Sequence, residues 1–189
     1  MEDPDRPEMP LAEVPDQILV ERAIDGDTVA FREIVRRHSG LMRAYVTRML
    51  SSATDADDVV QDAFVVAWRQ LPSLRDGAAV RAWLMRIASR EAYAVIRRRG
   101  REEPIEDRDF STPVDTRPEH VAIRNARLAA LSDALDMLPD AQRRAWLLRE
   151  SVGLGYAEIA AEMDLPVSTV RGNLARARAS IMIRMEEWR

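Results

Sequence analysis

No cysteine and no lysine occur in this chain of 189 residues. Without cysteine the protein can form neither a disulfide nor a thiolate metal site, and this suits the reducing cytoplasm in which we expect it to act. The two histidines, His38 and His120, lie far apart in sequence, so we expect no metal site. All 28 basic residues are arginine, which makes each arginine a weaker sign of phosphate binding than usual.

Glycine and long apolar runs are also scarce. The chain has 7 glycines, and its apolar residues, 47% of the total, recur at a helical period, which predicts an all-α protein. No apolar run approaches the roughly 18 residues of a membrane span, and the N-terminus lacks the order of a signal peptide, so we expect neither. We find no nucleophile paired with a base and no glycine-rich phosphate loop. We therefore expect neither an enzyme nor a bound cofactor.

The net charge of −4 conceals segments of opposite sign. Residues 1–16 sum to −5, residues 17–101 to +5, residues 102–118 to −4 and residues 119–189 to zero. Such segregation fits a protein that binds nucleic acid at some surfaces and repels it at others. Proline and acidic residues mark residues 1–15 as a disordered tail and 102–118 as a flexible acidic linker. The sequence thus predicts two small helical domains, at 16–101 and 119–189.

The stretch from Tyr156 to Met185 predicts two helices joined by a tight turn at 164–166. The second helix has one apolar face, formed by Val170, Leu174, Ala177 and Ile181. Between Leu165 and Met185 there are four arginines and no acid, as is typical of a recognition helix in the DNA major groove. An ordinary helical hairpin with a solvated basic face fits these features as well.

Two earlier helices also carry unusual surfaces. A helix that begins near Asp55 places Asp58, Gln61 and Asp62 on one face together with Val65, which has no structural reason to be apolar there. This face is either a docking surface for a basic partner or a set of solvated acids. A helix from Val80 to about residue 99 is strongly basic and carries Trp83, which could stack on bases or anchor the core.

The order of the motifs resembles bacterial sigma factors, and more closely the extracytoplasmic-function group, which retains only the second and fourth sigma regions. The resemblance covers about residues 16–185. It rests on Asp55-Ala-Asp-Asp58-Val-Val-Gln61-Asp62-Ala-Phe64, Trp83-Leu-Met-Arg86-Ile87-Ala88, Tyr156-Ala-Glu158-Ile159-Ala160 and Pro166-Val-Ser-Thr169-Val170-Arg171. Because two independent motif sets occur in the right order and separation, the resemblance is more specific than a lone helix-turn-helix.

The resemblance implies a subunit that binds core RNA polymerase and directs promoter-specific initiation. The residues implied to dock on the clamp helices of the largest subunit are Asp57, Asp58, Gln61, Asp62 and Val65. Those implied to bind the minus-ten DNA are Arg75, Arg81, Trp83, Arg86, Ile87, Arg90, Arg97 and Arg98. Those implied to bind the minus-thirty-five DNA are Ser168, Thr169, Arg171, Asn173, Arg176 and Arg178. Contact with the flap tip of the second-largest subunit and an inhibiting anti-sigma protein are further implied partners.

The chain also departs from the family pattern. Arg90 and Ala94 stand where asparagine and aspartate are common, which affects the expected minus-ten preference. Ser168 replaces a common glycine and is a plausible helix cap, and Asn173 replaces a common basic residue. Two alternatives stay open: a conventional dimeric helix-turn-helix regulator, which would need a dimer interface to span two half-sites, and a degenerate sigma-like interaction module that recognises no promoter.

Overall fold

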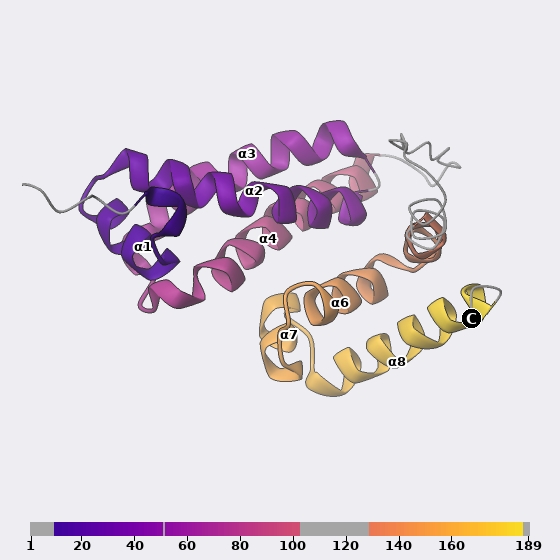
Figure 1. The fold of residues 1–189 in the computed structure, drawn as a ribbon. Coiled ribbons are helices and arrows are strands. Elements are labelled where there is room, and N and C mark those ends of the chain that lie inside the picture. Colours follow the sequence, from indigo (N-terminus) through magenta and orange to yellow (C-terminus); the bar gives the residue numbers. More distant parts are fainter. Residues whose placement is uncertain (1–9, 51, 103–128, 187–189) are drawn as a thin grey trace, which may run out of the picture.

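The computed structural model describes residues 10–50, 52–102 and 129–186, in which all regular structure is helical. Figure 1 shows two groups of helices, which confirms the predicted all-α class with two helical domains. The first group contains α1 (Asp16–Ile24), α2 (Thr28–Leu50), α3 (Ala53–Gln70) and α4 (Val80–Glu102). The second contains a helical stretch at 129–136, α6 (Asp140–Glu150), α7 (Tyr156–Met163) and α8 (Val167–Arg184). Short 3-10 helices lie at Leu11–Glu13, Leu71–Ser73 and Gly77–Ala79.

The expected flexible segments fall mainly outside the described residues. Residues 1–9 of the predicted tail and 103–118 of the predicted linker lie outside them. The prediction of a disordered tail is wrong for residues 10–15, because Leu11–Glu13 is helical and Val14 is buried. Arg37 Nη2 donates to the carbonyl oxygens of Leu11 and Ala12 at 2.6 and 2.9 Å. A partner 25 residues away in sequence thus orders a segment whose own composition favours disorder.

Helix α2 is the centre of the first group, since it packs against α1, α3 and α4. Its inner side chains Ile34, Met42 and Val46 are fully buried against residues such as Leu19 and Leu84. Burial of each side chain of this size is worth about 1.5–3 kcal/mol. Asp27 caps the helix by accepting hydrogen bonds from the Val29 and Ala30 amides, and these bonds, with one from Arg22, lower the pKa of the Asp27 carboxyl.

In the second group, α6 and α7 both pack against α8. Asp164 ends α7 in the left-handed region, at φ 53°, a conformation that aspartate tolerates better than most residues. Pro166 then precedes α8, so that the two helices are joined by the tight turn that the sequence predicts. Val170, Leu174, Ala177 and Ile181 are all buried, and the predicted inner face of α8 is therefore confirmed.

The two groups of helices touch each other. Helix α6 packs against α2, and α7 forms ion pairs with α4. In Figure 1, α6 and α7 lie on the side of the second group that faces α2 and α4, and α8 lies on the far side. The sequence predicted two domains joined by a tether but did not predict this contact.

Candidate polymerase-binding and DNA-binding surfaces

The α3 acidic face consists of Asp57, Asp58, Gln61, Asp62 and Val65, all of which are exposed. Val65 is 45% exposed although it is apolar, as the helical pattern indicates. Asp57 differs from the other acids because it receives Arg43 from α2, with Nε to Oδ1 at 2.5 Å and Nη2 to Oδ2 at 3.1 Å. This pairing lowers the pKa of Asp57 and raises that of Arg43. Asp57 therefore also ties α3 to α2.

Helix α3 begins two residues before the predicted start at Asp55. Ser52 is its N-cap and accepts a hydrogen bond from the Asp55 amide. The Asp55 carboxylate instead pairs with Arg99 of α4 at 2.5 Å. The start of the α3 acidic face is thus fixed to both neighbouring helices.

The α4 basic face consists of Arg81, Arg86, Arg90, Arg97 and Arg98, and Arg75 lies in the loop before this helix. These arginines are among the residues implied for minus-ten DNA. Five of these are exposed: Arg75, Arg81, Arg90, Arg97 and Arg98. Trp83 and Arg86 are half-buried, and Trp83 packs against the core. Ile87 is only 4% exposed and belongs to the core, so it does not lie on the exposed surface of α4, and its implied contact with DNA stays a prediction. The helical period places Ile87 one turn from Trp83, on the side of α4 that packs inward.

Two arginines of the α4 basic face are paired with carboxylates of α7. Arg86 Nη2 donates to Glu158 Oε1. Arg90 donates two hydrogen bonds to the Glu162 carboxylate, from Nη2 to Oε2 at 2.7 Å and from Nε to Oε1 at 2.9 Å. The Arg90 side chain is 63% exposed but that of Glu162 only 3%. These bonds raise the pKa of Arg90.

Arg144 of α6 lies beneath these pairs and is 3% exposed. Its guanidinium carbon lies 4.1 Å from the centroid of the Tyr93 ring of α4, and its Nη2 donates to the Glu162 carbonyl oxygen at 3.0 Å. Burial lowers the pKa of Arg144 and raises that of nearby Tyr45 to about 12. Sequence analysis missed Arg144, because nothing in the helical pattern of α6 distinguishes a buried arginine from an exposed one.

The exposed side of α8 carries five of the six residues implied for minus-thirty-five DNA: Ser168, Thr169, Arg171, Arg176 and Arg178. Asn173 is 6% exposed, so it does not lie on the exposed surface of α8, and its implied contact with DNA stays a prediction. Its Oδ1 accepts a hydrogen bond from Arg176 Nη2 at 2.9 Å. The expected cap role of Ser168 is wrong, because Pro166 is the N-cap and no side chain caps this helix.

Neighbouring helices orient two of the α8 arginines. The Arg171 guanidinium lies 5.5 Å from the centroid of the Tyr156 ring, within cation–π range. Arg178 Nη2 pairs with Glu150 of α6 at 3.1 Å, and hydrogen bonds to Glu150 and Tyr156 raise the pKa of Arg178. Both contacts come from the second group of helices, so the arginines are partly fixed before any ligand binds.

Other kinds of site find little support in the described parts of the chain. Within residues 10–50, 52–102 and 129–186, no three side chains of the types that bind metal ions gather at one place. Among the helices that the structure describes, none has the length and hydropathy to cross a membrane.

An exposed basic helix and a helix-turn-helix with exposed arginines together define a protein of the DNA-binding class, with a separate acidic face on α3. Comparisons with known families agree. Residues 34–102 match the family described as Sigma-70 region 2, and residues 128–181 match Sigma-70, region 4.

Curated relatives cover nearly the whole chain. The ECF RNA polymerase sigma-E factor of Escherichia coli strain K12 is 38% identical over 176 residues, which span 88% of this chain and 92% of that protein. The protein of the same name from Haemophilus influenzae is 38% identical over 177 residues, 88% of this chain and 93% of its own. The chain therefore belongs to the extracytoplasmic-function sigma factors of the sigma-70 family.

Two solved structures share this fold. CnrH, solved in complex with the cytosolic domain of CnrY, has a TM-score of 0.61 and 28% identity, covering 91% of this chain and 97% of its own. The sigma factor RpoE of Bartonella quintana, solved with the anti-sigma factor NepR, has a TM-score of 0.63 and 26% identity, covering 82% and 96%. As a sigma factor, the chain is a non-enzymatic initiation factor that directs promoter-specific transcription through regions 2 and 4.

Proposed function

We propose that the α3 acidic face docks on the clamp helices of the largest polymerase subunit. Asp58, Gln61 and Asp62 are exposed beside the exposed Val65, so that charge and apolar area lie together on one face. An interface of this composition combines electrostatic steering with a small apolar contact. Asp57 takes part through the orientation of α3, because Arg43 already occupies its carboxylate.

The exposed arginines of α4 bind the minus-ten strand, and Trp83 lies beside them. Arg97 and Arg98 suit phosphate contacts, and Trp83 is accessible enough to meet an unpaired base at its edge. In this proposal Ile87 acts only by packing, since it is buried. Arg90, which replaces a common asparagine of the family, is available to DNA only when Glu162 releases it.

The exposed residues of α8 enter the major groove of the minus-thirty-five element. Arg171 and Arg176 are suited to base edges and Thr169 and Arg178 to the backbone, while Asn173 positions Arg176. The observation that carries the whole proposal is that exposed arginines lie on two separate helices, α4 and α8, and an exposed acidic face lies on a third.

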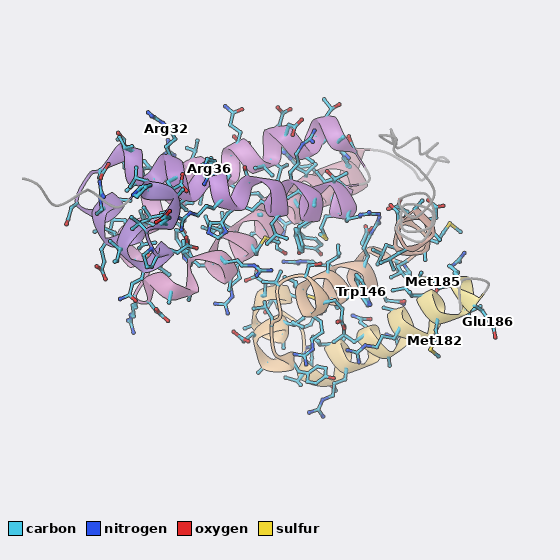
Figure 2. The ribbon with its side chains drawn as sticks, viewed as in Figure 1. Arg32, Arg36, Trp146, Met182, Met185 and Glu186 are labelled. Atoms are coloured by element: carbon cyan, nitrogen blue, oxygen red, sulfur yellow. The ribbon has the colours of Figure 1, made fainter. Side chains whose placement is uncertain are left out.

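Further partners follow from the surface and from the relatives. Met182 and Ile183, near the end of α8, are 59% and 72% exposed, which suits an apolar contact with the flap tip of the second-largest subunit. Figure 2 shows Met182 and Met185 at this end of α8, with Trp146 of α6 nearby. Because the Bartonella quintana relative was solved with an anti-sigma factor, we expect an anti-sigma protein to bind this chain as well. The sigma factor itself acts in the cytoplasm, where polymerase and promoter meet.

Run-off transcription tests the proposal. Purified core polymerase is incubated with and without the chain on a pooled promoter library, and the 5′ ends of the transcripts are sequenced. We expect chain-dependent start sites that share two upstream elements at a fixed spacing. Binding to core polymerase without such starts would instead indicate a degenerate interaction module.

A further inference from the structure

The 71–79 loop joins α3 to α4 and ends in the 3-10 helix Gly77–Ala79. Asp76 stiffens this end of the loop. Its Oδ1 accepts a hydrogen bond from the Ala78 amide, and its carbonyl oxygen accepts one from the Ala79 amide, both at 3.0 Å. A single 3-10 turn has little stability of its own, so the position of the loop depends on the element against which it packs.

That element is α1, which lies beside the loop and the start of α4 (Figure 1). A Cβ added at Gly77 would lie 3.1 Å from Gln17 Cα, 3.2 Å from the Gln17 carbonyl oxygen and 3.3 Å from Gln17 Cγ. Among the glycines that the structure describes, only Gly26 and Gly153 have a positive φ, so the backbone of Gly77 would accept any side chain. Glycine at this position therefore serves a close approach of the loop to the α1 backbone.

Helix α1 is in turn fixed to α2. Asp16, the residue before Gln17, accepts a hydrogen bond from Arg37 Nη1 at 2.7 Å, and its Oδ2 lies 2.7 Å from His38 Nε2. The inner side chains of α1 are buried. The Gln17 backbone thus gives the loop a firm support. This support precedes the matched sigma region 2, which begins at residue 34.

Two arginines of the minus-ten set flank the contact. Arg75 comes two residues before Gly77 and Arg81 four residues after it, and both are exposed. Because the hydrogen bonds of Asp76 tie the end of the loop together, a displacement at Gly77 should shift Arg75 as well. A guanidinium discriminates between bases only when its donors reach the base edge in the correct geometry. The position of the loop on α1 therefore affects how these arginines meet DNA.

We propose that the backbone of α1 at Gln17 positions the 71–79 loop, and with it Arg75 and Arg81, for base recognition in the minus-ten element. Gln17 and Gly77 are positioning residues, which act through the arginines and not by touching DNA. The inference rests on the proposed minus-ten role of the exposed arginines. It gives α1 a part in promoter selectivity.

Gly77→Ala and Gly77→Val in the full-length chain test the contact. The alanine requires the neighbouring atoms to give by a few tenths of an ångström, and the valine requires a larger displacement of the loop. Gly40→Ala is the matched control, because a Cβ at Gly40 meets nothing within 4 Å. Each variant is combined with core polymerase. Transcripts are sequenced from two promoter libraries, one randomised at the minus-ten element and the other at the minus-thirty-five element.

We expect Gly77→Ala to change base preference at some minus-ten positions by about three- to fivefold, part of the discrimination that one base contact provides. Gly77→Val should change the same positions further. Preference at the minus-thirty-five element should stay as in the wild type, and Gly40→Ala should change neither preference. Unchanged minus-ten preferences would overturn the inference. So would a uniform loss of transcription on all minus-ten sequences, which a merely structural role predicts.

Asp16→Asn tests the inference from the side of α1, and it serves also if the Gly77 variants prove unfolded by circular dichroism. Loss of the Asp16 charge weakens the ion pair with Arg37 that holds α1 on α2. Glu21→Gln is its matched control, since this exposed residue of α1 can still accept the bond from Gln17 Nε2. Asp16→Asn should alter preference at the minus-ten element alone. No alteration, or an equal one in the control, would contradict the inference.

Arg75→Ala and Arg81→Ala separate the inference from the proposed function. If these variants alter minus-ten preference but the Gly77 variants do not, only the positioning by α1 fails. If neither arginine variant alters minus-ten preference, the proposed minus-ten role of these arginines fails.

Discussion

Asn173 Oδ1 accepts a hydrogen bond from Arg176 Nη2 at 2.9 Å, within one turn of α8. Asn173 is buried and Arg176 is exposed, so the asparagine holds the arginine from the inner side of the helix. The Arg176 guanidinium also lies against Gly172, where an added Cβ would be 3.4 Å from Nη1. A guanidinium that is oriented before a ligand binds loses less conformational entropy on binding.

Arg176→Ala should lower promoter-specific transcription and relax base preference at one position of the minus-thirty-five element, by about 1–3 kcal/mol. Asn173→Ala should relax preference at the same position by a smaller amount, because Arg176 remains but loses its orientation. Transcription from a promoter library randomised at that element measures both effects. If Asn173→Ala altered a different position, Asn173 would be a direct base contact.

Asp58→Arg should weaken binding to core polymerase at least about tenfold, because it reverses a charge in the centre of the α3 acidic face. The isolated chain should keep its stability within about 0.5 kcal/mol, since Asp58 is exposed. Affinity for core by fluorescence titration and thermal melting of the chain provide the two measurements. A large fall in melting temperature would mark Asp58 as structural.

Asp57→Asn tests an orienting role, in contrast to the direct contact that we expect of Asp58. Because Arg43 binds the Asp57 carboxylate, this variant should lose part of its core affinity through a less firmly held α3. Neutralisation of Arg43, through Arg43→Gln, should reproduce that loss although Arg43 lies on α2. Full affinity in Arg43→Gln would show that the pair has no orienting role.

Arg144→Met should lower the free energy of unfolding by about 3 kcal/mol. This is the lower end of the range for removal of one partner from a buried charge pair, because the Glu162 carboxylate still has Arg90 as a second partner. For a chain of this size that loss corresponds to a fall in melting temperature of about 6–12 °C. Arg184→Met, on an exposed arginine of α8, is the matched control and should change stability little. Equal melting temperatures in the two variants would contradict the structural role of Arg144.

Acid should weaken the α1–α2 end of region 2 through Glu33. Hydrogen bonds from Arg36 and Arg37 lower the pKa of the Glu33 carboxyl from 4.5 to about 2. A lowered pKa in the folded state stabilises the protein above the unfolded-state value, and this contribution is lost as pH falls from 4.5 towards 2. Urea unfolding across that range should show a steeper loss in the wild type than in Glu33→Gln. A difference between the two proteins that does not vary with pH would contradict the assignment.

The helices, their inner faces and the family motifs could be predicted from the sequence because they depend on local periodicity and on short spacings. The buried face of α8 and the exposed Val65 of α3 follow from the helical period alone. The domain boundaries and the roles of the surface residues stay predictions. The family matches exclude the conventional helix-turn-helix regulator, since such a protein has no sigma region 2.

Errors arose where a side chain's environment depends on distant residues. Asn173 and Ile87 are both buried, although neither motif nor composition separates them from the exposed residues beside them. Residues 10–15 are ordered by Arg37, a contact that local composition does not reveal.

The sequence by itself determined an all-α sigma factor with two DNA-binding regions, because amphipathic periodicity and motif order persist in any arrangement of the helices. Only the tertiary structure decided which of its many arginines and acids meet. Arg86 and Arg90 share a four-residue spacing with Glu158 and Glu162, but in a chain with 28 arginines and 32 acids such matches are common. The burial of Arg144 between α2, α4 and α7 selects this register, and that burial exists only once the two regions have packed together.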